Sequence, residues 1–232
     1  MKTAVCFSGQ GRAAEYTYQN IQTHLLDELG DVDTFFHICD DENAHKIEKY
    51  FNPTSLLIEE DEYVNPENYI FYHGIRGTKL QYLHMVKSRQ RVNELRIEYE
   101  QNNNVKYDCV ISSRIDVKYF TPFRGMKNLD LNTLYVPDFH CFNGVQGKGY
   151  NDRFALGSSE KMNIYFSLFD KLQHYCSLGH RIHGESTLCF HLSHYNIEVN
   201  HLPFRFTRVR EGGNEIDSRL RAPRATWGHI DR

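Results

Sequence analysis

Polar residues follow the first apolar run of this sequence in a pattern that could bind an anion. Residues 3–8 form a short apolar run that leads into Gly9-Gln10-Gly11-Arg12. The glycines would let backbone N–H groups approach a ligand, and the N-terminus of the helix expected next favours a negative charge. The spacing Gly9-x-Gly11-x-x-Ala14 also fits the loose dinucleotide fingerprint, but Asp40 and Asp41 lie too far along the chain for its ribose-binding acid. The segment predicts either a nucleotide or phosphate contact or a tight strand-to-helix turn without a ligand.

A second cluster, Arg114-Ile115-Asp116, follows the nearly continuous apolar run 107–112. Side chains two positions apart in an extended chain point to the same side. A carboxylate at the edge of a sheet can hold a divalent cation that also binds a diphosphate, and an arginine can bind phosphate directly through two hydrogen bonds. The alternative is a surface salt bridge at the end of a strand.

Two acids later in the chain stand where elements are expected to begin. Asp152, followed by Arg153, precedes the apolar run 154–157 after a loop rich in Gly and Asn. Glu185 lies in the first turn of an apolar helix. Each acid either carries chemistry or is a plain charge at the end of an element, and the sequence by itself leaves both open.

These residues need a framework that brings the ends of several strands together. Apolar runs typical of strands alternate with helical patterns in the first half of the chain, with strands at 3–8, 32–39, 55–59 and 107–112 and helices ending near 29 and at 42–51 and 78–102. Later elements are strands at 134–137, 154–157 and 197–206 and helices at 159–175 and 185–195. This order predicts an α/β fold, Rossmann-like, with a mixed, mostly parallel sheet flanked by helices. In such folds the ligand lies at the carboxyl ends of the strands.

Composition limits the classes of protein to which this chain can belong. Its 232 residues, 40% of them hydrophobic, and the lack of any linker-like stretch predict one domain over residues 1–232. A net charge of −3 argues against a nucleic-acid partner, and no apolar run reaches the roughly eighteen residues of a transmembrane helix. The opening apolar stretch is too short for a signal peptide, so we expect a cytoplasmic protein whose six cysteines are reduced.

Histidines and C-terminal arginines are further candidates. His37 lies within an apolar run and is expected to be a hydrogen-bonded core residue, whereas His183 and His201 are candidate site histidines. The end of the chain is rich in arginine, and it is either a mobile lid that closes over a diphosphate or a solvated surface segment. The arginines of this tail are Arg205, Arg208, Arg210, Arg219, Arg221 and Arg224.

Together these motifs resemble those of the small GT-A-type glycosyltransferases of large DNA viruses of algae, chloroviruses among them, and of bacterial polysaccharide clusters. The similarity covers most of the chain through five pieces in order, 3–12, 34–38, 110–116, 152–158 and 183–185. It implies a GT-A-like fold and the transfer of a sugar from a nucleotide-diphosphate sugar, UDP being the commonest nucleotide, to a hydroxyl of a glycan or glycoprotein. Inversion at the anomeric carbon is favoured, and a viral source would place the enzyme in the host cytoplasm.

The resemblance also implies roles for individual residues. Glu185 is the expected base that deprotonates the acceptor, with Asp152 as the close alternative or as a ligand of a sugar hydroxyl. In GT-A enzymes a DxD motif holds Mn2+ or Mg2+ against the diphosphate, and here Arg114-Ile115-Asp116 takes its place with only the second acid kept. Either Asp116 holds the cation together with the diphosphate, or Arg114 replaces part of the metal's charge. The residues implied in nucleotide and donor binding are Ser8, Gly9, Gln10, Gly11, Arg12, Asp40, Arg114, Asp116 and Arg153.

Two other classes of function stay open. A Rossmann-type NAD(P)-dependent oxidoreductase rests on Gly9-x-Gly11-x-x-Ala14, and it predicts nicotinamide binding that does not need Asp116. A non-catalytic sugar-binding module would use aromatic residues, which make up 13% of the chain, and predicts glycan binding without a nucleotide. If the chain is a transferase, Tyr and Phe side chains of segments 63–72 and 135–150 are expected to line the sugar clefts.

Overall fold

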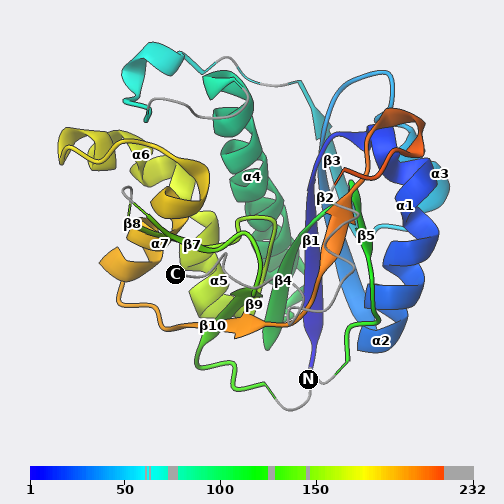
Figure 1. The fold of residues 1–232 in the computed structure, drawn as a ribbon. Coiled ribbons are helices and arrows are strands. Elements are labelled where there is room, and N and C mark those ends of the chain that lie inside the picture. Colours follow the sequence, from blue (N-terminus) through cyan, green and yellow to red (C-terminus); the bar gives the residue numbers. More distant parts are fainter. Residues whose placement is uncertain (61, 63, 73–77, 125–128, 145–146, 217–232) are drawn as a thin grey trace.

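A seven-stranded sheet forms the centre of the structure (Figure 1). The computed structural model describes residues 1–60, 62, 64–72, 78–124, 129–144 and 147–216. The strands of the sheet are β1 (Thr3–Gly9), β2 (Val32–Cys39), β3 (Ser55–Glu59), β4 (Cys109–Arg114), β6 (Leu134–Pro137), β9 (Phe154–Ser158) and β10 (Val199–Leu202). Their spatial order is β10-β6-β9-β4-β1-β2-β3. All neighbouring strands pair in parallel except that β9 runs antiparallel to β4 and β6.

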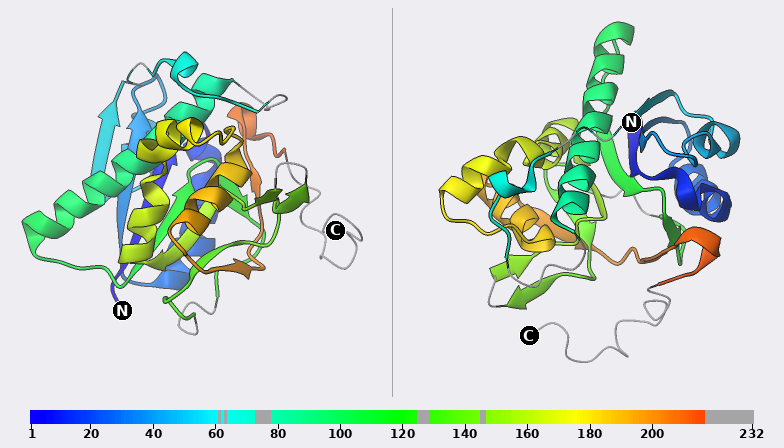
Figure 2. Two further views of the ribbon diagram at one scale, coloured as in Figure 1. Left: turned by 90° about the vertical axis from the view of Figure 1, so that its left-hand side faces the viewer. Right: turned by 90° about the horizontal axis from the view of Figure 1, so that it is seen from above.

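Helices cover both faces of this sheet (Figure 2). One face carries α1 (Ala14–Ile21), α2 (Asp27–Leu29) and α3 (Lys46–Tyr50), with a π turn at Gln22–Leu26 between α1 and α2. The other face carries α4 (Lys79–Asn103), α5 (Ser159–Phe166), α6 (Leu168–Ser177) and α7 (Gly184–His194). Two ribbons complete the fold, β5 (Val117–Tyr119) with β11 (Phe206–Arg208) and β7 (Phe142–Gly144) with β8 (Gly147–Gly149). Within the described residues, 3-10 turns lie at Gly11–Ala13, Pro66–Asn68 and Glu211–Gly213.

The central strand β1 shows why the sheet is buried on both sides. Val5 and Phe7 pack into the core beneath α1 and α3, whereas Ala4 and Cys6 pack into the core beneath α4 to α7. Burial among apolar neighbours raises the pKa of the Cys6 thiol to about 12, so this cysteine behaves as a small hydrophobic residue. Strands of this kind read as continuous apolar runs, which is the pattern found at residues 3–8.

The long helix α4 begins and ends at residues suited to those positions. The Thr78 hydroxyl accepts a hydrogen bond from the Gln81 backbone N–H at 3.1 Å, and the Gln81 side chain accepts one from the Thr78 N–H at 3.3 Å. This capping box satisfies donors that the first turn leaves unpaired. At the other end Asn104 adopts φ 52°, the left-handed conformation that commonly ends a helix. The helix predicted at 78–102 is therefore confirmed.

The predicted α/β architecture with a mixed, mostly parallel sheet is confirmed, and it is compatible with a Rossmann-like fold. Two predicted elements are wrong. The strand expected at 197–206 is divided into β10 and β11, which belong to different sheets, because Pro203 between them lacks an N–H for pairing. The helix expected at 159–175 is divided at Ser167, whose hydroxyl bonds the Ile164 carbonyl at 2.9 Å. No helix within the described ranges is both long and apolar enough to cross a bilayer.

Candidate functional site

The carboxyl ends of β1 and β4 bring the first two predicted motifs side by side. Ser8 pairs with Arg114 in the register of these strands, so segments 9–12 and 114–116 leave the sheet at the same edge. Asp40 directly follows β2, the neighbour of β1 on its other side, and is exposed there. The structure thus places the predicted donor-binding residues of the first half of the chain along one edge of the sheet.

The local backbone geometry after β1 requires glycine at two positions, 9 and 11. A Cβ on Gly11 would lie 2.4 Å from the backbone oxygen of Asn43, in the turn before α3. Gly9 adopts φ 135°, which residues with a side chain rarely adopt. Next to them Gln10 is exposed and Arg12 is half-buried. Because the turn itself accounts for the glycine spacing, the match to the dinucleotide fingerprint adds little support for a dinucleotide.

A buried carboxylate, Asp116, lies at the centre of an arginine cluster and is 6% exposed. Arg114 donates two hydrogen bonds to it, from Nε to Oδ1 at 2.7 Å and from Nη2 to Oδ2 at 2.8 Å. Arg210 donates a third, from Nη1 to Oδ2 at 2.9 Å. Burial raises the pKa of this carboxyl, but the charges of Arg114, Arg210 and Arg12 outweigh burial and lower the pKa below its usual value. Two guanidinium groups therefore bind one carboxylate and the charge of Arg12 acts on it as well, which leaves positive charge for an anion.

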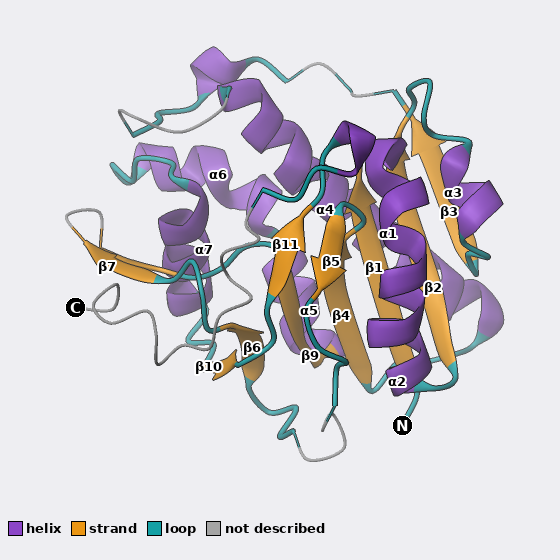
Figure 3. Ribbon diagram, turned by 45° about the vertical axis from the view of Figure 1, so that its right-hand side comes forward, coloured by secondary structure: helices purple, strands orange, loops and turns teal. Residues whose placement is uncertain are grey.

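Long-range backbone pairing carries Arg210 to this cluster. β11 runs antiparallel to β5, with Arg208 opposite Val117, and Figure 3 shows this ribbon next to α1. The Val209 N–H donates to the Asp116 carbonyl at 2.8 Å, so the next residue reaches the carboxylate. Up to residue 216 the arginine-rich tail is thus a strand and turn paired to the body of the protein. Outside the described residues lie Arg219, Arg221 and Arg224.

The carboxylate of Asp116 is bound by arginine on both oxygens. A Mn2+ or Mg2+ ion takes oxygen ligands, so it would have to displace at least one guanidinium group to reach Asp116. Within the part of the chain that the structure describes, no group of three or more His, Cys, Asp or Glu side chains could hold a metal ion. A divalent cation at Asp116 stays a prediction.

The two later acids, Asp152 and Glu185, are held next to each other by the backbone. Asn151 is fully buried, and its side-chain oxygen accepts a hydrogen bond from the Arg153 N–H at 2.9 Å. The Tyr150 N–H donates to the Glu185 carbonyl at 3.0 Å, which ties this loop to the first turn of α7. A connection between segments far apart in the sequence thus brings both predicted acids to one place.

The pKa values of these two acids are shifted in opposite directions. Burial raises the pKa of Asp152, but the charges of Arg89, Arg153 and Arg114 outweigh burial and lower the pKa. Arg89 is the contacting partner, with Nη2 at 3.5 Å from Oδ2. Burial, followed by the negative charge of Asp152, raises the pKa of Glu185. Glu185 therefore accepts a proton at a higher pH than an ordinary glutamate, while Asp152 stays ionised, a separation typical of acid–base pairs.

Arg114 joins the two groups of acids into one site. It binds Asp116 directly, and its charge also acts on Asp152. We call this region the edge site; its acids are Asp116, Asp152 and Glu185, and the arginines whose charges act on them are Arg12, Arg89, Arg114, Arg153, Arg208 and Arg210. Arg114 and Arg210 both bind the Asp116 carboxylate at this edge of the sheet, and guanidinium groups also bind phosphate oxygens, so the edge site suits an anionic ligand such as a diphosphate.

Arg89 is a member of the edge site that sequence reasoning did not identify. It lies on the buried face of α4, three residues after Val86. The same face carries Arg96, which is fully buried and donates to Asn93 at 2.8 and 3.0 Å. The sequence signal for Arg89 and Arg96 is their helical spacing from the buried apolar residues of the same helix. A charged residue on such a face must be buried, so it needs a partner inside the fold.

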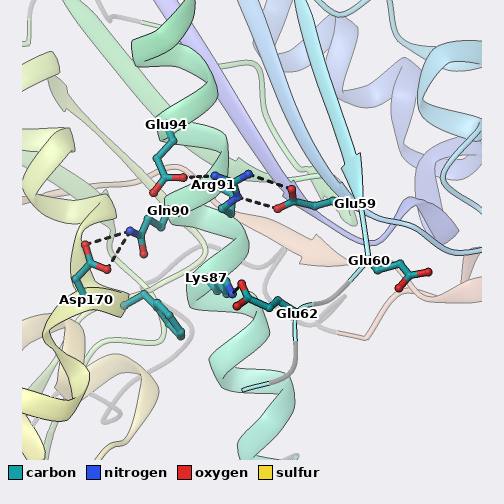
Figure 4. A pocket seen from close by; sticks show the side chains of 9 residues that line it. Glu59, Glu60, Glu62, Lys87, Gln90, Arg91, Glu94 and Asp170 are labelled. Atoms are coloured by element: carbon teal, nitrogen blue, oxygen red, sulfur yellow. Dashed lines mark hydrogen bonds and ion pairs between the residues drawn. The ribbon is translucent and has the colours of Figure 1, made fainter. Parts of the chain in front are cut away.

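A separate groove of about 380 Å³ lies between the end of β3, α4 and α6 (Figure 4). Ion pairs cross this groove: Arg91 donates to Glu59 at 2.7 and 3.0 Å, and Lys87 pairs with Glu62. None of the residues predicted for the site lines it. The lining residues are Glu59, Glu60, Glu62, Lys87, Gln90, Arg91, Glu94, Phe169 and Asp170.

His37, beside this groove, is a hydrogen-bonded core histidine, as predicted. Its Nδ1 lies 2.7 Å from the Ser88 hydroxyl and its Nε2 lies 3.0 Å from Glu59 Oε1. Serine, histidine and glutamate have the composition of a nucleophilic triad, but Ser88 lies inside α4, where backbone N–H groups donate within the helix and cannot stabilise an oxyanion. Hydrogen bonds from Arg91 lower the pKa of Glu59 to about 2. The chain of contacts therefore has a structural role.

The sequence matches one known family along most of its length. The model described as Domain of unknown function (DUF7796) matches residues 1–212, and the chain belongs to this family. The match includes the central sheet and every residue of the edge site. A comparison with curated proteins finds no match. The chemistry is therefore inferred from the edge site.

Proposed function

We propose that this protein is a glycosyltransferase that moves a sugar from a nucleoside-diphosphate sugar, with UDP as the favoured nucleotide, to a hydroxyl of a glycan or glycoprotein. The observation that carries the proposal is the edge site, where an arginine cluster around Asp116 adjoins the oppositely shifted acids Asp152 and Glu185. Arginines suit a diphosphate, and the acid pair suits proton transfer at a hydroxyl. A GT-A-like fold and a cytoplasmic location belong to the same proposal.

The arginine cluster would stabilise the leaving group. When the bond between the anomeric carbon and the diphosphate breaks, its electron pair leaves with the diphosphate oxygen, and negative charge grows there. Arg114 and Arg210 bind Asp116, the charge of Arg12 acts on the same carboxylate, and guanidinium groups can bind phosphate oxygens through paired N–H donors. Asp116 holds Arg114 and Arg210 in place. A Mn2+ or Mg2+ ion at Asp116 would add charge neutralisation once a guanidinium group had moved from the carboxylate to the diphosphate.

Glu185 is the proposed base. Its raised pKa makes it the better proton acceptor of the pair, and its side chain is 24% exposed, so an acceptor hydroxyl can reach it. The hydroxyl gives its proton to Glu185 while its oxygen bonds to the anomeric carbon opposite the leaving diphosphate, which inverts the configuration. Asp152 is 12% exposed and ionised, which suits a ligand of a sugar hydroxyl better than a base.

A ligand panel tests the nucleotide specificity. We expect UDP to raise the melting temperature of the protein, with GDP and TDP giving smaller shifts and NAD giving none. Arg210→Met should lose the UDP shift because a diphosphate ligand disappears. Arg124→Met is the matched control, since Arg124 is 79% exposed and pairs only with Glu28 at 3.7 Å among the described residues. Stabilisation by NAD alone would overturn the proposal in favour of the oxidoreductase.

Donor hydrolysis separates catalysis from simple sugar binding. We expect slow release of UDP from a UDP-sugar by the wild type and its loss in Asp116→Ala, in which Arg114 and Arg210 lose the group that orients them. Glycan binding without nucleotide binding or hydrolysis in the wild type would contradict the proposal and indicate a sugar-binding module.

A further inference from the structure

Arg89 is a buried arginine on α4 that lies against the segment carrying Asp152. It is 6% exposed, and its Nη2 lies 3.5 Å from Asp152 Oδ2. A buried charge costs free energy unless a partner inside the fold compensates it. Within the described residues, Asp152 is the acid that pairs with Arg89. The partner of this buried charge is therefore an acid of the edge site.

Arg96, further along the same helix, is a buried arginine with a different kind of partner. It is fully buried and donates to Glu100 at 2.7 Å and to Ser159 at 2.9 Å, which lie on α4 and α5. These contacts join two helices of the framework, outside the edge site. Arg89 instead reaches Asp152, so its charge acts where the chemistry is proposed.

Tyr165, on α5, ties Arg89 to the backbone of Asp152. Its hydroxyl accepts a hydrogen bond from Arg89 Nη1 at 3.2 Å and donates to the Asp152 carbonyl at 3.5 Å. The guanidinium carbon of Arg89 also lies 5.9 Å from the centre of the Tyr165 ring, which is within the range of a cation–π contact. Arg89 thus contacts the carboxylate of Asp152 while Tyr165 contacts its carbonyl. We call Arg89 and Tyr165 together the Asp152 clamp.

The charge of Arg89 acts on Asp152 together with groups from several elements. Burial raises the pKa of Asp152, and the charge of Arg89 opposes this more strongly than those of Arg153 and Arg114. Burial, followed by the negative charge of Asp152, raises the pKa of Glu185. The charged and titratable groups that interact with Asp152 are Arg89 and Tyr82 of α4, Arg114 of β4, Tyr165 of α5, His183 and Glu185 at the start of α7, and Arg153 next to it in the chain.

We propose that Arg89, held by Tyr165, is the positioning residue that keeps Asp152 as a carboxylate beside Glu185 and so directs the proton to Glu185. The inference rests on the proposed sugar transfer, in which Glu185 takes the proton of the acceptor hydroxyl. Of two neighbouring carboxyl groups, the one closer to a positive charge keeps its negative charge and the other takes up the proton first. Without the charge of Arg89, the two acids would compete for one proton.

Carbon-13 NMR of the side-chain carboxyl groups in ligand-free protein tests the clamp directly, with Asp152→Asn and Glu185→Gln identifying the two signals. In the wild type, Asp152 should titrate at a lower pH than Glu185. Arg89→Gln removes the charge and keeps a hydrogen-bond donor, and it should raise the titration midpoint of Asp152 by about 1 pH unit or more. Arg89→Lys, which keeps the charge, should restore the wild-type midpoint.

Arg91→Gln is the matched control, because Arg91 lies on the same helix and pairs with a different carboxylate, Glu59 at 2.7 Å, beside the groove. It should lose an ion pair and leave the midpoint of Asp152 unchanged. The same Asp152 midpoint in Arg89→Gln and Arg91→Gln would overturn the inference. A wild type in which Glu185 titrates below Asp152 would also overturn it, and this measurement does not depend on any variant of Arg89 folding.

The rate of UDP release from a UDP-sugar adds a functional readout. In Arg89→Gln the acid limb of the pH–rate profile should lie at higher pH than in the wild type, because Asp152 then shares the proton with Glu185. A purely structural role of Arg89 would lower stability and the maximal rate without moving the limb or the NMR midpoint, and that result would overturn the inference. Shifted midpoints in a protein that releases no UDP from any UDP-sugar would leave the clamp standing and overturn the proposed function.

Discussion

Replacing Asp116 by asparagine should destabilise the protein without removing its anion site. Asp116→Asn keeps the shape of the side chain and removes the charge that balances Arg114 and Arg210. Three charge-assisted hydrogen bonds end on this buried carboxylate, at 2.7, 2.8 and 2.9 Å. Breaking a buried ion pair from one side costs about 3–5 kcal/mol, because the partner charge is left uncompensated, and we expect the free energy of unfolding to fall by that amount.

The same variant separates two roles of Asp116. If the arginines bind the diphosphate, removing the negative charge among them makes the site more positive. Inorganic pyrophosphate should then bind Asp116→Asn at least as tightly as it binds the wild type, in the presence of EDTA. If Asp116 acts mainly as a metal ligand, pyrophosphate binding will need Mn2+ in the wild type and will be lost in the variant.

Urea unfolding followed by circular dichroism gives the stability, and titration calorimetry gives the pyrophosphate affinity. Asp170→Asn is the matched control, since Asp170 accepts hydrogen bonds from Gln90 at 3.0 and 3.1 Å at an exposed position. Its stability should stay within about 0.5 kcal/mol of the wild type. Equal stability of the two variants would refute the buried ion pairing of Asp116 with Arg114 and Arg210. Loss of pyrophosphate binding in Asp116→Asn under EDTA would refute the claim that the arginine charges alone hold the diphosphate.

Further perturbations test other parts of the structure. Glu185→Gln should slow UDP release by about 10²–10⁴-fold while UDP binding is kept. In Asp152→Asn the acid limb of the pH–rate profile should lie at lower pH than in the wild type, because the Asp152 charge raises the pKa of Glu185. A limb at the same pH in both proteins would exclude Glu185 as the base. Burial holds the pKa of His191 at about 4 instead of 6.5, so the unfolded chain takes up the proton first. The free energy of unfolding should therefore fall as pH drops from 6.5 to about 4, by up to about 3 kcal/mol, and urea titrations of His191→Gln should show a smaller loss. Gly11→Ala should lower the free energy of unfolding by about 1–3 kcal/mol, because its Cβ would lie 2.4 Å from a backbone oxygen. An unchanged melting temperature would show that the backbone of this turn shifts to accommodate a methyl group.

Local patterns predicted the parts of the fold that depend on local physics. The unbroken apolar run of β1 identifies an interior strand, and the apolar spacing of α4 together with Thr78 at its start identifies a long helix. The prediction failed where one apolar run serves two partners. β10 and β11 look like one strand in the sequence, but Pro203 separates them and each pairs in a different sheet.

The candidate site was predictable only where a general rule of folds applies. Parallel strands end at one edge of a sheet, so a site at the carboxyl ends of the strands was expected, and the structure pairs Ser8 with Arg114 at that edge. The contact between Arg210 and Asp116 joins residues 94 positions apart and depends on the β5–β11 pairing, which no periodicity specifies. The approach of Glu185 to Asp152 likewise depends on a backbone hydrogen bond between distant segments.

The central claim is that the edge site transfers a sugar from a nucleoside-diphosphate donor. The most direct measurement is to incubate the protein with UDP-sugars and a panel of glycan acceptors, with Mn2+ or with EDTA, and to quantify released UDP and glycosylated product by mass spectrometry. We predict equal amounts of UDP and product from the wild type, and neither from Glu185→Gln although that variant still binds UDP. Transfer by Glu185→Gln at the wild-type rate, or no turnover of any nucleotide sugar by the wild type, would contradict the claim.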